Sequence, residues 1–458
     1  MEAVELKLSE VLIDNEKFRF DSEFVSKDYL AVKNILLSNN YKYLSKLHKF
    51  NARYKQPIYD DNSNIKVLNS QYIRDYFLDY ESAKLGYGAI VPKEAVMINS
   101  TGVGTLGRVN INYLSENISV DNHVNIIVAK EINPYYLTMF LKSHYGQSQI
   151  NRYYSGSSGQ IEIYAKDFNN FLVAIFSNNF QLEIENLVKT SYQKLGDSKN
   201  LYKEAENLLL KELDLVDFTP SDENISIKSF KDSFMQTGRL DSEYYQAKYD
   251  ELIDHIKKAN FDKLDNIVNI KKSIEPGSEA YQDSGIPFIR VSNVTKFGIS
   301  DTDIYLSRNI LKEEELQKLY PTKDTILLSK DGTVGIAYKI KNETEMITSG
   351  ALLHLSIKKD DVLPEYLTLV LNSLIVQLQA QRDAGGSIIQ HWKPSEIQEI
   401  LIPIIDISVQ KQIEEKIKKS FLLKEESKQL LDLAKKAVEI AIEKDENEAI
   451  KIINEEII

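Results

Sequence analysis

The pattern of hydrophobic and polar positions divides the chain into strand-like stretches and two long helical stretches. Short apolar or alternating runs, among them VNIIVAK (124–130), IPFIRVSNV (286–294) and DTILLSK (324–330), predict strands because Gly, Asn and Asp bound them. Residues 180–213 and about 408–445 instead carry apolar side chains at helical spacing, with Lys and Glu between them. This spacing predicts two long helices that bury their apolar stripes against each other and leave other faces for partners. The pair Gly196-Asp197 marks an expected local break in the first helix.

The same succession of motifs occurs twice along the chain. RFDSEF (19–24) is matched by RLDSEY (239–244), GTLG (104–107) by GTVG (332–335), PYYLT (134–138) by PEYLT (364–368), SGSSGQ (155–160) by GGSIIQ (385–390), and the apolar run and helix start of 167–188 by 396–417. The offsets are 220, 228, 230, 230 and 229 residues. Five matches in order at nearly constant offset indicate a tandem duplication.

The duplication rules out a nucleotide-binding loop at residues 100–108. Gly102, Gly104 and Gly107 have G-x-G-x-x-G spacing, but a strand-like run follows them and the second copy, SKDGTVG (329–335), lacks the first glycine. Both copies keep only G-T-[LV]-G, which predicts a tight turn that uses the positive φ of glycine. The turn residues are Gly104, Thr105 and Gly107 in copy one and Gly332, Thr333 and Gly335 in copy two.

A second motif has a structural explanation as well. Asn133-Pro134-Tyr135-Tyr136 is similar to the tetrad with which amino-methyltransferases hold a flipped base, but it lacks the second proline. Copy two has Leu363 at the place of the asparagine. A proline followed by an amphipathic stretch in both copies predicts a helix start.

Composition narrows the class of function further. The chain has 458 residues, no cysteine and a formal net charge of −12, and its six histidines are scattered without a metal-binding spacing. No apolar run is long enough to cross a membrane and no export signal is present, so we expect a cytoplasmic protein without a metal site. No catalytic set is evident; the E-x-x-x-K of residues 162–166 has no equivalent in copy two.

Candidate DNA-binding residues occur in both copies. Basic and aromatic side chains alternate over residues 42–55, a pattern that suits contact with phosphates and base edges, although a solvated amphipathic helix explains it too. Aligning NIKVLNSQ (64–71) with IPFIRVSNV pairs Lys66 with Arg290 and Asn69 with Asn293, either as scaffold or as DNA contacts. The full set of candidates is Lys42, Tyr43, Lys46, Lys49, Arg53, Lys55, Lys66, Asn69, Lys271, Lys272, Arg290 and Asn293.

The order of these motifs resembles the specificity subunit of type I restriction–modification systems. R-x-D-S-E-[FY], IPFIRVSNV, LLSKDGTVG, G-x-x-x-Q and Gln181/Gln410-x-x-Ile are similar to successive signatures of that family, and the resemblance covers essentially the whole chain. IPI (402–404) fits the family's I-P-[IL] element, whereas copy one departs from it with VAI (173–175).

The resemblance implies an α+β protein with two tandem β-rich target recognition domains, each followed by a long helix, the helices pairing as an antiparallel coiled coil. The implied division is recognition domain 1 (1–175), first helix (176–216), linker (217–237), recognition domain 2 (238–404), and second helix with an acidic tail (405–458). It further implies a non-catalytic subunit that reads a split, asymmetric sequence in double-stranded DNA.

The implied partners are two adenine-methyltransferase subunits, which bind AdoMet and flip the target adenine, together with motor-nuclease subunits where restriction occurs. The expected partner-facing positions are Gln181, Leu187, Leu195 and Leu208 in the first helix and Gln410, Ile417, Leu430 and Ala437 in the second.

Three alternatives remain from the sequence. A type IIB-like specificity subunit would have the same fold and a partner that combines methyltransferase and nuclease. A coiled-coil adaptor whose β-rich domains bind protein would not bind duplex DNA. A nuclease or methyltransferase would need catalytic residues that no motif of this chain supplies.

Overall fold

A computed structural model describes residues 6–456 except 13, 14, 16, 23, 157, 158, 224 and 386–389. Residue 23 of the first motif and parts of 155–160 and 385–390 thus lie outside the described residues. The chain forms two compact units, each of which is described by itself. Unit 1 comprises Met1–Gly196 and Leu423–Ile458, and unit 2 comprises Asp197–Leu422.

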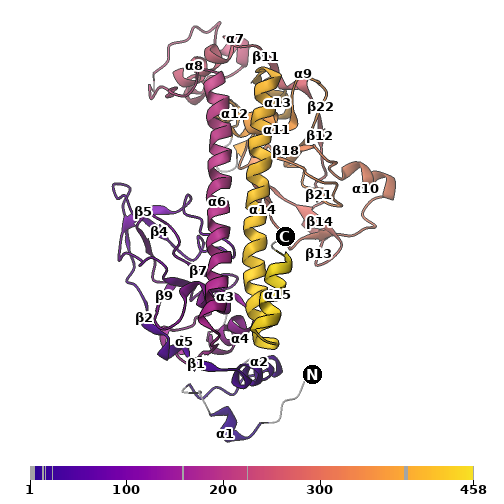
Figure 1. Ribbon diagram of the computed structural model, residues 1–458. Coiled ribbons are helices and arrows are strands. Elements are labelled where there is room, and N and C mark those ends of the chain that lie inside the picture. The colour runs from indigo at the N-terminus through magenta and orange to yellow at the C-terminus, as the bar shows by residue number, and fades with distance from the viewer. Residues whose placement is uncertain are drawn as a thin grey trace. The chain divides into compact units, whose positions relative to one another are not determined.

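The first repeat contains a β-rich domain between short helices and ends in the long helix α6 (Figure 1). Its helices are α1 (Leu8–Val11), α2 (Lys27–Ser38), α3 (Pro134–Lys142), α4 (His144–Tyr153), α5 (Ala165–Phe168) and α6 (Asn178–Glu212). Its strands are β1 (Tyr41–Tyr43), β2 (His48–Arg53), β3 (Ile58–Tyr59), β4 (Lys66–Leu68), β5 (Lys84–Tyr87), β6 (Val96–Asn99), β7 (Val109–Ile111), β8 (Ile118–Val120), β9 (Val124–Ala129) and β10 (Leu172–Ala174).

The second repeat has the same plan and ends in the long helix α14. Its helices are α7 (Phe234–Thr237), α8 (Ala247–Ile256), α9 (Leu264–Ile267), α10 (Glu313–Leu319), α11 (Pro364–Asn372), α12 (Leu374–Asp383), α13 (Pro394–Glu399), α14 (Ile407–Glu443) and α15 (Glu446–Glu456). Its strands are β11 (Phe261–Lys263), β12 (Val268–Lys272), β13 (Tyr281–Gln282), β14 (Ile286–Ile289), β15 (Val294–Thr295), β16 (Gly298–Ile299), β17 (Tyr305–Leu306), β18 (Ile326–Ser329), β19 (Asp331–Gly332), β20 (Ala337–Lys339), β21 (Ile347–Thr348), β22 (Leu352–Ile357), β23 (Gln390–His391) and β24 (Leu401–Pro403).

The two four-stranded sheets of each repeat correspond strand for strand. The order β2-β9-β6-β7 in copy one matches β12-β22-β18-β20 in copy two, and β3-β5-β4-β8 matches β13-β17-β14-β21. In the second pair of sheets, β4 runs parallel to β8 and β14 runs parallel to β21, while the other strand pairs are antiparallel. The duplication read from the sequence is therefore a duplication of the fold.

Both prolines of the repeated P-x-Y-L-T motif start a helix, as predicted. Pro134 and Pro364 occupy the first turn of α3 and α11, where the missing N–H of proline costs no hydrogen bond. The side chain of Asn133 accepts hydrogen bonds from the backbone N–H groups of Tyr135 and Tyr136. The asparagine of the methyltransferase-like tetrad is therefore a helix cap.

Buried polar side chains join the helices to the sheets through the same bonds in both copies. The Tyr136 hydroxyl donates to the Ala174 carbonyl at 2.8 Å, and that of Tyr366 donates to the Pro403 carbonyl at 2.7 Å. The Gln149 side chain donates to the Leu172 carbonyl and accepts from the Leu172 N–H, and Gln379 forms the same two bonds with Leu401. Because a buried polar group without a partner is costly, these bonds define where each helix can dock.

The long helices pack antiparallel within each unit, as predicted. In unit 1, the Ser191 hydroxyl donates to the Ser427 carbonyl at 2.7 Å, and in unit 2 that of Ser198 donates to the Ser420 carbonyl at 2.7 Å. Small serine side chains let the two backbones come close, and their hydroxyls are satisfied by the neighbouring helix. The break expected at Gly196-Asp197 is wrong, because α6 is continuous from Asn178 to Glu212. One glycine in a helix of this length weakens it without ending it.

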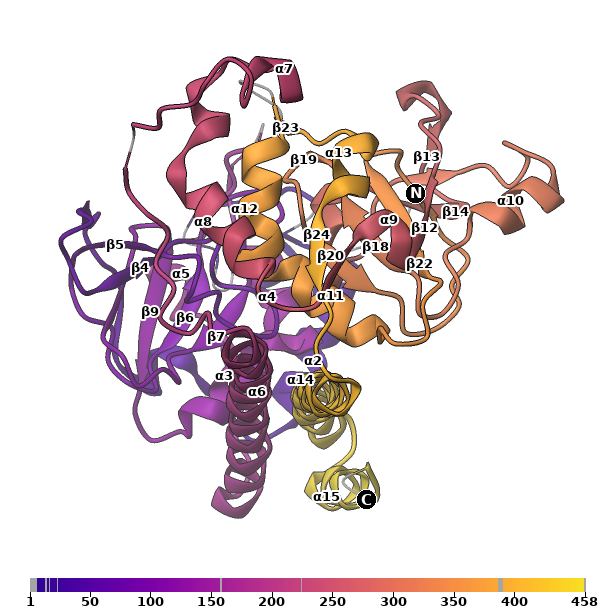
Figure 2. The same cartoon turned by 90° about the horizontal axis from the view of Figure 1, so that it is seen from above.

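The acidic C-terminal segment is a packed helix. Ala449 and Ile453 of α15 are buried in the core of unit 1, and Figure 2 shows α15 alongside α14. The Glu446 carboxylate accepts a hydrogen bond of 2.7 Å from the backbone N–H of Ser177. The acidic residues of this segment thus cover the outer side of an amphipathic helix.

The compact units do not follow the linear division predicted from the sequence. Each unit contains one β-rich domain, part of α6 and part of α14. Leu431, Ala434 and Val438 of α14 share one core with the first β-rich domain, whereas Tyr202, Ala205 and Leu209 of α6 share the core of the second. The predicted helix segments 176–216 and 405–458 enclose α6, α14 and α15, but each long helix divides its packing between two cores.

Candidate nucleic-acid interface

The G-T-[LV]-G motif forms the predicted turn in both copies. Gly104 and Gly107 have φ values of +78° and +82°, and Gly332 and Gly335 have +75° and +83°. The turn joins β6 to β7 in copy one and β18 to β20 in copy two. The carbonyls of Gly107 and Gly335 accept hydrogen bonds of 2.9 and 2.8 Å from Gln147 and Gln377, so the turn is anchored to a helix. Thr105 caps it by donating to the Thr101 carbonyl at 2.9 Å, and the carbonyl of Thr333 accepts from Ser329.

The basic and aromatic residues of 42–55 lie on strands, so the amphipathic-helix alternative is wrong. Residues 41–43 form β1, residues 44–46 a short 3-10 turn, and residues 48–53 the edge strand β2. Lys46, Lys49 and Lys55 are exposed, Tyr43 is 36% exposed, and Lys42 lies 3.7 Å from Glu131. The DNA contacts predicted for these residues stay a prediction.

Strand register relates the basic residues of the two copies in a way that the sequence did not reveal. Arg53 of β2 pairs with Asn125 of β9, and Lys272 of β12 pairs with Leu353 of β22. Since β9 and β22 are repeat equivalents, Arg53 and Lys272 occupy the same position at the end of equivalent edge strands. Lys271 precedes Lys272 and donates to the Lys318 carbonyl.

The predicted pairing of Lys66 with Arg290 and of Asn69 with Asn293 is wrong by three residues. Leu68 pairs with Val120, and Ile289 pairs with Thr348, so that Asn69 and Arg290 are the residues that follow each strand. The turns that begin there agree, because the N–H of Tyr72 donates to the Asn69 carbonyl and that of Asn293 to the Arg290 carbonyl. Insertions and deletions between the copies change the repeat offset, so an alignment without gaps does not show this register.

Two of these four residues have structural roles. The Lys66 ammonium donates to the Glu81 carbonyl at 2.6 Å and lies 5.2 Å from the centre of the Tyr80 ring. Asn293 is 8% exposed; its Oδ1 accepts from the Arg290 N–H at 3.0 Å and its Nδ2 donates to the Asp301 carbonyl at 3.1 Å. Asn293 therefore holds the backbone of Arg290 in place.

Four equivalent surface positions differ between the copies, and we call them the variable face. Three pairs of backbone hydrogen bonds define the equivalences. The N–H groups of Asp121 and Ser349 donate to the strand-end carbonyls of Leu68 and Ile289. The N–H groups of Ser100 and Lys330 donate to the carbonyls of His123 and Ala351, and their own carbonyls accept from Ile163 and Trp392. The variable face consists of Asn69, Thr101, His123 and Glu162 in unit 1, and of Arg290, Asp331, Ala351 and His391 in unit 2. All eight residues are at least partly exposed.

In unit 1 the variable face contains two polar pairs. Thr101 Oγ1 lies 2.9 Å from His123 Nδ1, and Glu162 forms an ion pair with Arg53. Burial disfavours the charged form of Glu162, but the hydrogen bonds from Arg53 and Tyr164 outweigh it and hold the pKa of Glu162 below its ordinary value. Glu162, which the sequence offered only as part of a nuclease-like match, is thus an ionised acceptor.

In unit 2 the same place carries different chemistry. Asp331 lies 2.9 Å from His391 Nδ1 and forms an ion pair with Lys330. Burial raises the pKa of Asp331, but the hydrogen bonds from Lys330 and His391 bring it below the ordinary value. These contacts were not predicted from the sequence because the residues lie beside the repeated motifs. Positions that differ next to a shared motif are the signal that points to them.

The eight helix residues expected to face partner proteins are used inside the chain, which corrects that prediction. Gln181 Oε1 accepts from the Asn133 N–H, and Gln410 Oε1 from the Leu363 N–H, at 2.9 and 3.0 Å. Five of the others lie in or against the two cores, namely Leu187, Leu208, Ile417, Leu430 and Ala437, and Leu195 is buried at 6% exposure. Their apolar character reflects domain packing.

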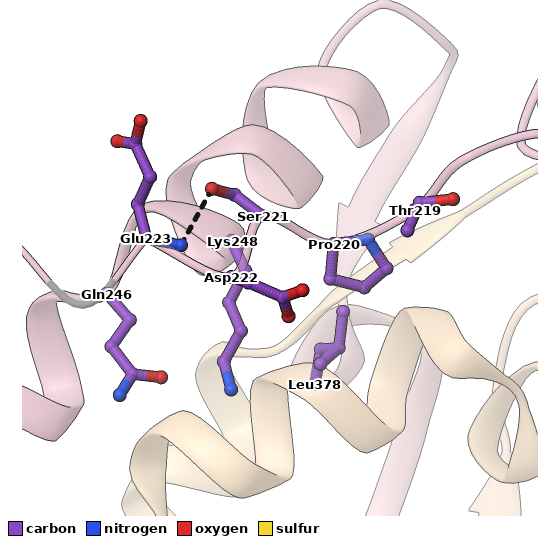
Figure 3. Close-up of a pocket in the computed structure, with 8 residues that line it drawn as sticks. All are labelled: Thr219, Pro220, Ser221, Asp222, Glu223, Gln246, Lys248 and Leu378. Carbon is purple, nitrogen blue, oxygen red and sulfur yellow. Dashed lines mark hydrogen bonds between the residues drawn. The ribbon is translucent and has the colours of Figure 1, made fainter.

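One cavity of unit 2 borders the linker between the repeats. A cavity of about 530 Å³ in unit 2 lies between the linker and α12, lined by residues such as Pro220, Asp222, Lys248 and Leu378 (Figure 3). The dashed line in Figure 3 marks a hydrogen bond of 3.1 Å within the linker, from the Glu223 N–H to the Ser221 hydroxyl. Among the described residues, no group of His, Asp or Glu could hold a metal ion.

No helix among the described residues is long and apolar enough to span a membrane.

Comparisons with known proteins found one family and several solved structures to which the chain is similar. Residues 256–433 match the family described as the type I restriction modification DNA specificity domain. The S subunit of the type I restriction-modification system from M. genitalium is 15% identical over 90% of this chain and 96% of that chain, with a TM-score of 0.39. The HsdS subunit from Thermoanaerobacter tengcongensis is 13% identical over 89% and 97%, with a TM-score of 0.29. No curated protein sequence matches the chain.

The matched residues run from the end of α8 into α14 and include the variable face of unit 2. The chain therefore carries a type I restriction modification DNA specificity domain. The first repeat has the same four-stranded sheets, glycine turn and internal hydrogen bonds as this domain.

Proposed function

We propose that the two recognition domains read the two halves of a split, asymmetric DNA sequence, and that the chain directs two adenine-methyltransferase subunits to it. The observation that carries the proposal is the contrast between an equivalent scaffold and a variable face. Two readers of different half-sites need the same frame with different side chains at the base edges.

Basic edge strands support the placement of DNA beside the variable face. Arg53 and Lys272 end equivalent strands, and exposed lysines of β2 and β12 lie along the same edges. Phosphate contacts position a protein on the duplex, whereas base contacts specify the sequence. The net charge of −12 is compatible with this arrangement where basic surfaces of the partners share the phosphate contacts.

The methyltransferase subunits would bind AdoMet and carry out base flipping and transfer, so this chain would contribute recognition alone. Two copies of one partner need two equivalent surfaces. Lys189 and Lys418 are such a pair, since each is about half exposed and forms an i,i+4 ion pair, with Glu185 and Glu414 respectively. Motor-nuclease subunits would add restriction.

The first experiment is sequencing of modified bases in cells that express the chain with its methyltransferase partner, and in cells that express the methyltransferase alone. We expect methylation of a split motif with a fixed gap that requires this chain. Methylation that is independent of the chain, or that occurs at an unsplit motif, would contradict the proposal and favour the adaptor alternative.

Docking is tested with Lys189→Glu and Lys418→Glu. Each variant reverses the charge of the lysine in the ion pair that both copies form. Native mass spectrometry of the complex should show one methyltransferase lost in each variant. Lys211→Glu is the matched control, because Lys211 is an exposed lysine of α6 whose repeat equivalent is Ile440. Retention of two methyltransferases in both variants would place docking elsewhere.

A further inference from the structure

Asn69 and Arg290 occupy the same place in the two recognition domains. Each immediately follows the strand that runs parallel to β8 or β21, and each begins a turn closed three residues later by an N–H to its own carbonyl, at 3.0 Å for Asn69 and 2.9 Å for Arg290. The strand ends are held alike, because the N–H of Asp121 binds the Leu68 carbonyl and that of Ser349 binds the Ile289 carbonyl. The backbone is thus equivalent while the side chain differs.

This difference stands out against the polar residues that the copies share. Gln147 and Gln377, Gln149 and Gln379, and Tyr136 and Tyr366 are identical and form equivalent bonds. These three scaffold positions are therefore kept as the same residue with the same partner. A polar surface position that changes on an unchanged backbone has the property required of a base contact in two domains that read different half-sites.

The Arg290 side chain is placed for binding outside the chain. It is 43% exposed, and its nearest carboxylate, Asp303, is 4.0 Å away and 91% exposed. Its Nε is buried and has no hydrogen-bond partner among the described residues. The bond from the Arg290 N–H to Asn293 fixes the backbone from which the guanidinium extends, so the charged end is held at the surface with donors available.

Asn69 places a smaller polar side chain on the same backbone conformation. It is partly exposed, and its Oδ1 accepts a hydrogen bond of 2.8 Å from the Gln71 N–H, which shapes the loop. The amide oxygen has a second lone pair and the amide nitrogen has two N–H groups, so beside its hydrogen bond with Tyr59 the amide can still form a bidentate contact. Arginine pairs bidentately with guanine O6 and N7, and asparagine with adenine N6 and N7.

We propose that Arg290 reads a guanine in the half-site of the second recognition domain and that Asn69 reads an adenine at the corresponding position of the other half-site. The two residues then distinguish the half-sites at this position. This inference rests on the proposed function, because it requires each domain to read one half of a split motif.

The test exchanges the two side chains within the full chain, in complex with its methyltransferase partner. Each residue already occurs on this backbone in the other copy, so Arg290→Asn and Asn69→Arg are compatible with the fold. Methylation is measured on a duplex library in which every base pair of both half-sites is varied. Arg308→Asn is the control, since it removes another exposed arginine of the same domain.

Arg290→Asn should reduce the preference for guanine at one position of one half-site by about 5- to 150-fold and shift it toward adenine. Asn69→Arg should shift one position of the other half-site from adenine toward guanine, with the gap unchanged. Arg308→Asn should leave the motif intact. A wild-type split motif that both exchange variants leave unchanged would overturn the inference and keep the proposed function. The absence of a split motif in the wild type would overturn both.

Discussion

At the scale of single residues, a small set of buried polar side chains fixes each recognition domain, and the variable face is built on that frame. Thr138 and Thr368 donate to the carbonyls of Pro134 and Pro364 at 2.7 Å, and Gln147 and Gln377 bind the glycine turns. Because the frame is satisfied internally, the surface beside it can change without loss of the fold.

The glycine turn gives the first residue-scale prediction. Gly332 and Gly335 both have positive φ, but a Cβ at Gly332 would meet nothing within 4 Å, whereas one at Gly335 would lie 2.8 Å from the Gln377 side chain. Gly332→Ala should cost about 1 kcal/mol from backbone strain alone. Gly335→Ala should cost at least about 1 kcal/mol more, because it also displaces Gln377. Denaturant unfolding of both variants measures the difference, and equal costs would contradict the anchoring role of Gln377.

His354 gives a pH-dependent prediction. It lies in β22, is 5% exposed, and its Nε2 is 2.8 Å from Thr348 Oγ1. Burial, with a smaller effect of the charge on Lys271, lowers the pKa of His354 to about 4. Between that value and the ordinary 6.5 the unfolded chain binds more protons, so the free energy of unfolding falls as the pH falls through this window, by up to about 3 kcal/mol.

His354→Ile should remove this part of the acid sensitivity, since copy one has the fully buried Ile126 at the equivalent place. The measurement is the free energy of unfolding of both proteins at pH 6.5 and pH 4. Thr348→Val is the control, because it removes the hydroxyl while the imidazole stays buried. An unchanged pH slope in His354→Ile would assign the acid sensitivity to other groups.

At the scale of elements, helix pairing depends on small side chains at the points of closest approach. Ser191 and Ser427 are fully buried in unit 1, and Ser198 and Ser420 are nearly so in unit 2. The pairs are repeat equivalents at the same offset of 229 as the helices. The helix contact was thus duplicated along with the recognition domain.

Ser191→Leu should separate α6 from α14 within unit 1, because a larger side chain has no space between the two backbones. Overpacking of this kind costs about 1–3 kcal/mol. The neighbouring Thr190 is exposed, so Thr190→Leu should change the free energy of unfolding by less than about 0.5 kcal/mol. Similar effects of the two variants in denaturant unfolding would show that the helices are not in close contact at Ser191.

At the scale of the molecule, each recognition domain is completed by the helix that follows the other one. The last turns of α14 and the whole of α15 pack in the core of unit 1, although they lie more than 250 residues after its β-rich domain. The core of unit 1 is therefore incomplete without the C-terminal residues, and a substitution in α15 affects the stability of unit 1.

Ile453→Ala should destabilise unit 1 by about 2–5 kcal/mol, because Ile453 is 2% exposed in that core. Amide hydrogen exchange should accelerate in β6 and β9 and stay unchanged in β18 and β22. Asn454→Ala, at the adjacent exposed position, should leave both sets unchanged. Acceleration confined to unit 2, or none, would contradict the assignment of α15 to the first core.

The sequence by itself determined the duplication, the helix starts at Pro134 and Pro364, the glycine turns and the long helices, because these depend on local periodicity and on backbone preferences of single residues. Only the tertiary structure decided that residues 42–55 are strands and that Asn69 matches Arg290, since strand register is set by pairing with distant segments. It also decided that the apolar helix stripes face two cores and that Glu162 meets Arg53 across the domain. Those contacts join residues far apart in the chain, and no local pattern records them.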